Sequence, residues 1–264
     1  FKSFILLALL VFTCASFAFA QKTEEKNAKK ENKQQAVDPN NLTAEQVAES
    51  AIVIYGGGGR ENLNRIRKTA FERGKMIINN PDGTVDNANY ERWVIRADSL
   101  EKERIRFEQQ FPNTRFALIY DGEKLFGLFN ETVFTPKEDA GKAFENQIWH
   151  GLEALLRYKE NESKIELAKR DKIMGVDFYL LDVTDKQNRK TRFYISAKTY
   201  RVMMLEYQED GTKYTRRFYD YNYAQGTLVP YRTVLWADDK QIEETEIQTI
   251  TFGQRVEENM FRGS

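Results

Sequence analysis

The sequence predicts a mainly β protein of the α+β class, built on one antiparallel sheet of about eleven or twelve strands. From Lys68 onward, apolar and polar residues alternate with a period of two, so that Ile105 and Phe107 share one face of a strand. Turn signals separate the runs, and most connections are too short for a crossover helix, which makes the sheet antiparallel. The turn signals are Asn80-Pro81-Asp82-Gly83, Phe111-Pro112-Asn113, Asp121-Gly122, Asp210-Gly211 and Asp238-Asp239.

Residues 1–20 have the parts of a cleaved secretory signal peptide, which predicts export. Lys2 supplies the cation, an apolar run follows, and Ala18-Phe19-Ala20 is the small-residue cleavage motif. The only cysteine, Cys14, lies inside this segment, so the cleaved product contains no thiol and no disulfide. The alternative is a lipoprotein anchored at Cys14; Thr13 before it and the apolar residues after it favour plain cleavage.

Residues 21–42 mix Lys, Glu, Gln and Asn with few apolar side chains, and we expect a disordered, charged leader there. A single folded domain is expected over residues 43–264. It should begin with a helix in which Thr43 and Gln46 form a capping box, and this helix should run to about Tyr55.

A run of four glycines, Gly56–Gly59, follows that helix. A phosphate-binding loop would need a Lys-Ser/Thr pair after the glycines, whereas the chain continues with Arg60-Glu61-Asn62. We therefore interpret the run as a helix stop and hinge, with a short helix after it near Leu63 to Arg67.

One long helix interrupts the strands. The segment Thr135-Pro136-Lys137-Glu138 has the form of a capping box with proline at the first helical position. The apolar residues after it recur at helical spacing. Two interpretations remain open: an ordinary helix packed on the sheet, or a lid over a cavity. The lid residues would be Phe144, Ile148 and Leu152.

The residue content argues against several functional classes. Lys plus Arg equals Asp plus Glu at 40 each, so the chain has no excess positive charge that would attract nucleic acid. His150 is the only histidine and no Gly-x-Ser-x-Gly motif is present, so we predict no metal site, no catalytic residue and no cofactor. We interpret His150 as structural or partly exposed. Acidic and basic residues on the strands, including Glu243 to Glu246, are interpreted as solvated faces.

Three segments of the chain are similar to segments of a known protein family. They are the strand–turn–strand segment Tyr120 to Leu125, the segment Phe218-Tyr219-Asp220-Tyr221 with Gly226 and Pro230-Tyr231 after it, and Val256 to Phe261, which looks like a closing strand end. With the order of helices and strands, they make residues 43–261 resemble the outer-membrane lipoprotein-sorting superfamily. That superfamily includes the LolA carrier, the LolB receptor and regulators of the RseB/MucB type.

The resemblance implies a strongly curved, antiparallel half-barrel with helices over its concave face. It also implies a monomeric periplasmic carrier that holds lipid or lipoprotein acyl chains and that an envelope protein loads or unloads. The alternative is an envelope interaction or sensor module that binds a protein partner and transports no lipid.

An acyl chain would have to lie against apolar strand faces. Each buried methylene contributes roughly 0.8 kcal/mol, so a palmitoyl chain gains about 12 kcal/mol before ordering costs. A methionine side chain is flexible, so a methionine in the cavity wall can adapt to the shape of the ligand. The alternative for each residue is ordinary core packing. The cavity candidates are Trp93, Ile95, Ile105, Phe107, Phe116, Leu118, Tyr120, Phe193, Ile195, Val202 and Met204, with Phe144, Ile148 and Leu152 as the lid.

Overall fold

The computed structural model describes residues 41–168 and 170–263, in which one compact unit begins at Leu42. The predicted signal peptide, Cys14 and nearly all of the charged leader lie outside these residues. Within the described part of the chain, no helix is both long enough and apolar enough to cross a bilayer.

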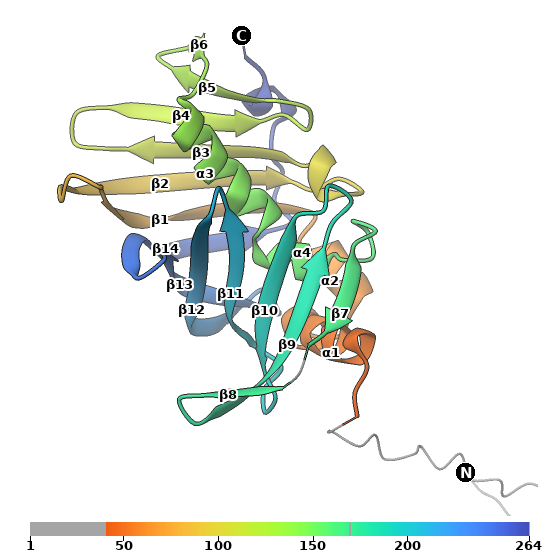
Figure 1. Cartoon of the computed structure of the whole chain (residues 1–264). Coiled ribbons are helices and arrows are strands. Elements are labelled where there is room, and N and C mark those ends of the chain that lie inside the picture. Colours follow the sequence, from red (N-terminus) through yellow and green to blue (C-terminus); the bar gives the residue numbers. More distant parts are fainter. Residues whose placement is uncertain (1–40, 169, 264) are drawn as a thin grey trace, which may run out of the picture. The chain divides into compact units, whose positions relative to one another are not determined.

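A single antiparallel sheet dominates the structure, and fourteen strands are described in it (Figure 1). The predicted turn signals each join two consecutive strands. The count exceeds the expected eleven or twelve because β6, β7 and β8 have only three or four residues, too few for alternation to show. The strands are β1 (Thr69–Asn79), β2 (Val85–Ile95), β3 (Arg104–Gln110), β4 (Arg115–Tyr120), β5 (Leu125–Phe129), β6 (Thr132–Phe134), β7 (Lys164–Leu167), β8 (Asp171–Ile173), β9 (Val176–Thr184), β10 (Lys190–Ser196), β11 (Val202–Glu209), β12 (Thr212–Ala224), β13 (Thr227–Ala237) and β14 (Lys240–Phe252).

The strand order explains why helices cross the sheet. Neighbouring strands follow the order β6-β5-β4-β3-β2-β1-β14-β13-β12-β11-β10-β9-β7, and β8 pairs with β9. The first and last strands, β1 and β14, meet inside the sheet, whereas β6 and β7 are its two edges. Because β6 precedes β7 in the chain, the connection between them must run from one edge to the other. It contains α3 (Glu138–Trp149) and α4 (Leu152–Leu156), and Figure 1 shows α3 running across the concave face of the curved sheet.

The first helix confirms its predicted boundaries within one residue. In α1 (Ala44–Gly56), Thr43 Oγ1 accepts a hydrogen bond from the Gln46 amide at 3.2 Å, and Gln46 Oε1 accepts one from the Thr43 amide at 2.8 Å. The helix ends where Gly57 takes a left-handed conformation with φ of 59°, and a Cβ there would lie 2.5 Å from Gly226 O. The glycine run is therefore a helix stop, followed by α2 (Arg60–Ile66).

The inserted helix differs from its prediction in two ways. Its N-cap is Lys137 and no side chain caps it, so the capping box expected from Thr135 to Glu138 does not form. The helix also breaks after Trp149, where His150 is the C-cap and a Cβ on Gly151 would lie 2.8 Å from Gln147 O. The break separates α3 from α4 and lets the chain turn toward α1.

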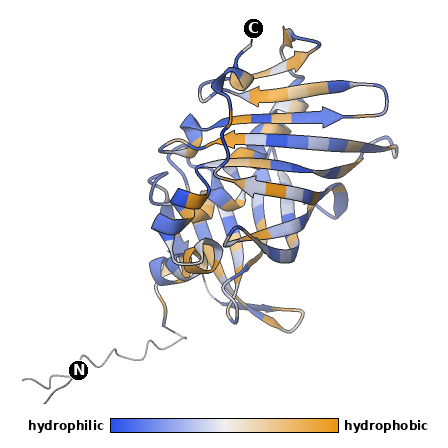
Figure 2. Ribbon diagram, turned by 180° about the vertical axis from the view of Figure 1, so that it is seen from behind, coloured by the Kyte–Doolittle hydropathy of each residue, from blue (hydrophilic) through white to orange (hydrophobic). Residues whose placement is uncertain are grey.

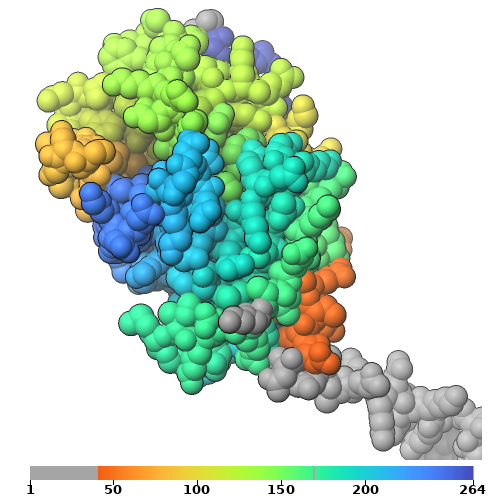
Figure 3. All heavy atoms as spheres, viewed as in Figure 1, coloured from red at the N-terminus to blue at the C-terminus, as the bar shows by residue number. Residues whose placement is uncertain are grey.

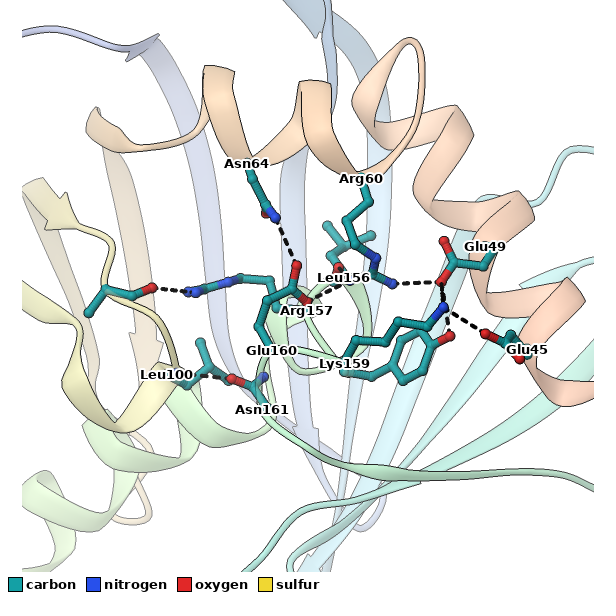
Figure 4. A network of polar contacts seen from close by, with 12 residues as sticks. Glu45, Glu49, Arg60, Asn64, Leu100, Leu156, Arg157, Lys159, Glu160 and Asn161 are labelled. Carbon is teal, nitrogen blue, oxygen red and sulfur yellow. Dashed lines mark hydrogen bonds and ion pairs between the residues drawn. The ribbon is translucent and has the colours of Figure 1, made fainter.

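Polar contacts join α1, α2 and the segment after α4 at one end of the sheet (Figure 4). Arg60 bridges Glu49 at 2.8 Å and Glu160 at 2.6 Å, and Asn64 donates a hydrogen bond to Glu160 at 2.7 Å. Lys159 pairs with Glu45 at 2.6 Å. Below these helices, apolar side chains of α1 pack directly on β9 to β11 and leave that part of the concave face filled. They include Val47, Ile52 and Tyr55 from α1 and Leu181, Phe193 and Ile195 from the strands.

The opposite face of the sheet is covered in part by the end of the chain, seen from behind in Figure 2. A short 3-10 helix, Glu258–Phe261, buries Phe261 against Ile119 and Phe126. The expectation of a closing strand end at Val256 to Phe261 is therefore wrong. The physical reason is that β14 already pairs with β1 and β13 on its two sides, so no free edge is left beside it.

Candidate functional site

The concave face is hollow beneath the first half of α3. A trough of about 960 Å³ lies between α3 and strands from both halves of the sheet, near the upper end of the range for small-molecule sites. Figure 3 shows this side of the molecule, with α3 between the two groups of strands. Polar side chains line the rim, and the floor is largely apolar. Floor residues include Met76, Ile78, Phe107, Phe116, Leu118, Tyr207, Tyr214 and Leu235.

The register of the strands places these apolar side chains side by side. Phe107 on β3 lies opposite Leu118 on β4, and its ring stacks on Phe144 of α3 at a centroid distance of 6.1 Å. Tyr90 on β2 packs against the same ring at 5.5 Å. The helix therefore contacts the floor at Phe144, while Ala143 beside it lines the trough with a small, exposed side chain.

The trough continues toward the β6 edge of the sheet. An almost wholly apolar hollow of about 420 Å³ shares Phe116, Leu118 and Ala140 with the trough. Phe129 and Phe134 also line it, and Phe129 is exposed to solvent. The two hollows therefore adjoin at the three residues that they share, next to the start of α3.

A third hollow, called the deep hollow below, lies beyond Gln147 of α3. Its volume is about 230 Å³, and Ile105, Ile148 and Leu152 contribute apolar surface to it. Gln147 stands between the deep hollow and the trough: its Oε1 accepts a hydrogen bond from Arg92 Nη2 at 2.6 Å, and its Nε2 donates to Glu243 Oε2 at 3.4 Å. Phe144, Gln147 and Glu243 line both spaces, so the two hollows adjoin at this bridge.

Charged side chains make up much of the wall of the deep hollow. Glu153 Oε1 pairs with Arg67 Nη1 at 2.8 Å and with Arg96, and Arg67 also donates to Thr227 Oγ1 and Leu228 O. Burial would raise the pKa of Glu153, but the positive charges of Arg96 and Arg67 outweigh it and lower the pKa to about 2. Glu153 is therefore ionised at neutral pH, and its carboxylate is stabilised in the wall of the hollow by the two arginines.

The structure brings together seven of the predicted site residues around these hollows. Four further candidates lie on the same face but do not line a hollow. One of them, Tyr120, packs against Trp149. The other three belong to the filled core under α1 and are named below. The seven are Ile105, Phe107, Phe116, Leu118, Phe144, Ile148 and Leu152. The three core residues are Phe193, Ile195 and Val202.

Three candidates were assigned to the wrong face. Trp93 and Ile95 pack with the C-terminal segment on the opposite side of the sheet, because Trp93-Val94-Ile95 is apolar throughout and alternation cannot show which residue points inward. Met204 also faces outward, in a cluster with Phe178 and Tyr194. The physical reason is a β-bulge: Ile195 pairs with Val202 and Tyr194 with Met204, so one extra residue shifts the register.

Two arginines that face inward were not predicted from the sequence. Arg92 and Arg216 lie on strands and were interpreted as part of a solvated outer face, whereas both line the deep hollow. Their strand partners carry a usable signal: Arg92 lies opposite Phe107 and Arg216 opposite Leu205, both buried. A charged residue that alternates in phase with the buried positions of its neighbours is an inward-facing residue.

His150 is a buried structural residue in the described part of the chain. Its Nδ1 lies 2.7 Å from Thr191 Oγ1, and its ring stacks on Tyr207 at 4.1 Å. Burial, reinforced by the positive charge of Arg189, lowers the pKa of His150 to about 4. Within residues 41–168 and 170–263, no group of three or more His, Cys, Asp or Glu side chains is arranged to hold a metal ion.

The depressed pKa of His150 predicts a stability that falls on acidification. The unfolded chain binds a proton at an ordinary pKa near 6.5, and the folded chain only near 4, so protonation favours unfolding in this window. The stability contributed by neutral His150 is complete above the unfolded pKa and is lost toward the folded pKa, by about 3 kcal/mol. Urea titrations across this window should show the loss in the wild-type chain and a much smaller loss in His150→Gln. Equal losses in the two chains would contradict this assignment.

Comparison with known proteins defines the fold. No protein-family model matches the sequence, and comparison with curated proteins gives no match. A DUF1329 family protein from Desulfovibrio piger superposes with a TM-score of 0.61 at 12% identity, over 84% of this chain and 98% of that one. A LolA superfamily protein from Nitrosomonas europaea gives 0.56 at 13% identity, over 84% and 98%. The chain has a LolA-like fold. A domain described as an outer membrane lipoprotein-sorting protein, from Vibrio parahaemolyticus, gives 0.53 at 16% identity, over 73% and 88%.

Proposed function

We propose that this LolA-like protein is a periplasmic carrier that holds an acyl chain of a lipid or lipoprotein in the trough between α3 and the sheet. The observation that carries the proposal is the apolar trough of about 960 Å³, which the protein's own side chains leave unfilled. Burying a palmitoyl chain there contributes roughly 12 kcal/mol before ordering costs, at about 0.8 kcal/mol for each methylene.

The proposed contacts come from both walls of the trough. Phe107, Phe116 and Leu118 form the floor, and Phe144 of α3 lies above them. In this proposal α3 acts as the cover of the site. The helix is suited to that role because polar residues of its exposed face, such as Lys142, line the rim. An envelope protein that loads or unloads the chain completes the proposed cycle.

The direct test is to extract the purified full chain with organic solvent and to analyse the extract by mass spectrometry. We expect an acyl lipid in near-stoichiometric amount, and uptake of a fluorescent fatty acid by protein stripped of lipid. Repeatedly empty preparations that also take up no fatty acid would contradict the proposal. Recovery of a stoichiometric envelope protein with only traces of lipid would instead favour a sensor module.

A further inference from the structure

The deep hollow beyond Gln147 has a chemistry that an acyl chain alone does not explain. Its wall includes four arginines and four glutamates. Placing so many charges around a space of about 230 Å³ beside a hydrophobic core costs desolvation free energy. Hydrocarbon in contact with this wall would strip the charges of water and return no hydrogen bond. The charged residues are Arg67, Arg92, Arg96, Arg216, Glu72, Glu103, Glu153 and Glu243.

The carboxylates of this wall already have donors. Glu153 Oε1 is shared by Arg67 and Arg96, and Glu103 is paired with Arg157 outside the wall. The remaining two accept hydrogen bonds from neighbours on the same face. Glu72 Oε1 accepts from Tyr90 Oη at 2.6 Å, and Glu243 Oε2 from Gln147 Nε2 at 3.4 Å.

The arginines, in contrast, have donors to spare. Within the described residues, Arg92 Nε, Arg96 Nη1 and both Nε and Nη2 of Arg216 are buried and make no hydrogen bond. Among the described side chains of this wall, Glu153 Oε2 is the one buried carboxylate oxygen that makes no hydrogen bond. Arg216 also has no carboxylate oxygen within 4.0 Å among the residues described. Buried guanidinium nitrogens without acceptors are costly, and a small oxyanion is the ligand that satisfies several of them at once.

The position of these donors relative to the trough suits a ligand with two parts. The hollow and the trough adjoin at Phe144, Gln147 and Glu243, and Arg92 contacts the bridge through its Nη2 while its Nε is unpaired. A headgroup in the hollow would therefore continue directly into a chain that runs under α3 toward the β6 edge.

We propose that the deep hollow binds the anionic headgroup, a carboxylate or phosphate, of a single-chain amphiphile whose tail lies in the trough. Arg92, Arg96 and Arg216 donate to the oxyanion, and Gln147 sets the boundary between head and tail. The inference rests on the proposed acyl-chain site and adds to it the ligand class and the direction in which the ligand lies.

The test compares probes that share one chain and differ in the headgroup. Palmitate and hexadecyl phosphate are the anionic probes, hexadecanol is the neutral probe, and inorganic phosphate and acetate are headgroups without a chain. For the full chain we expect both anionic probes to bind at least about tenfold more tightly than hexadecanol, the size of a charge-assisted hydrogen bond. Arg216→Gln should reduce this preference to about twofold or less and leave hexadecanol binding unchanged.

Arg217→Gln is the matched control, because Arg217 is the next residue on β12, is exposed and lies over Trp236 on the other face. It should keep the full anion preference, and thermal melts should show that both variants are folded. Equal binding of hexadecanol and palmitate to the wild-type chain would overturn the headgroup assignment and leave the acyl-chain site standing. If no probe with an acyl or alkyl chain binds, both the headgroup assignment and the acyl-chain site are contradicted. Binding of inorganic phosphate as tightly as hexadecyl phosphate would assign the hollow to a free anion instead.

Discussion

Replacing Arg157 by methionine is expected to lower the free energy of unfolding by about 3 to 5 kcal/mol, the cost of leaving a buried charge without its partner. Arg157 and Glu103 are both almost fully buried and form an ion pair, and Arg157 Nη2 also donates a hydrogen bond to Ala97 O. Burial raises the pKa of Glu103, and the positive charges of Arg96 and Arg157 oppose the rise. Chemical denaturation at neutral pH measures the effect.

Two further variants separate the charge effect from simple loss of packing. Arg157→Met combined with Glu103→Leu should recover most of the loss, because an apolar pair removes both charges from the interior. Arg73→Met, which breaks an exposed pair with Glu91, should change the stability by less than about 1 kcal/mol. An Arg157→Met chain within about 1 kcal/mol of wild type would show that Glu103 is not held by this pair.

Filling the trough is expected to abolish most lipid uptake. Ala143 of α3 is exposed and lines the trough, so Ala143→Trp adds an indole to the space proposed for the chain without touching the core. We expect the affinity for a fluorescent fatty acid to fall by at least about tenfold, the loss of roughly two buried methylenes or more. Fluorescence titration gives the number directly.

The control places the same indole on an exposed turn away from the hollows. Lys198→Trp lies between β10 and β11, and it should bind the fatty acid as wild type does. The melting temperatures of both variants should stay close to that of the wild-type chain. Unchanged fatty-acid affinity in a folded Ala143→Trp chain would contradict the trough as the site.

The fold could be predicted from local chemistry to a large extent. Alternation and turn residues identified the strands and the hairpins, and the Thr43 capping box identified α1, because all of these are set by residues close in the chain. The strands of three or four residues were not predicted, and neither was the break of the inserted helix at Gly151. Three or four residues are too few for alternation to show. At Gly151 the cause is local, because a Cβ there would lie 2.8 Å from Gln147 O, and a glycine in a helical pattern does not by itself predict a break.

The residues that line the candidate site were predicted in part, and the errors in their placement have definite causes. Alternation placed Phe107 on the inner face because the charged residues Arg106 and Glu108 flank it and show which side is apolar. It failed at Trp93, where three apolar residues follow one another, and at Met204, which follows a bulge. The buried arginines escaped because a strand arginine is usually solvated, and only the phase of the neighbouring strands shows that Arg216 points inward.

The central claim is that an acyl chain lies in the trough under α3. A palmitate analogue with a photoreactive group at its tail, crosslinked to the full chain and mapped by peptide mass spectrometry, tests it most directly. The account predicts labels on α3 near Ala143 and on β3 and β4 near Phe107 and Leu118, and competition by unlabelled palmitate. Labels confined to the outer face, such as the cluster around Phe178, or no label that palmitate can displace, would contradict it.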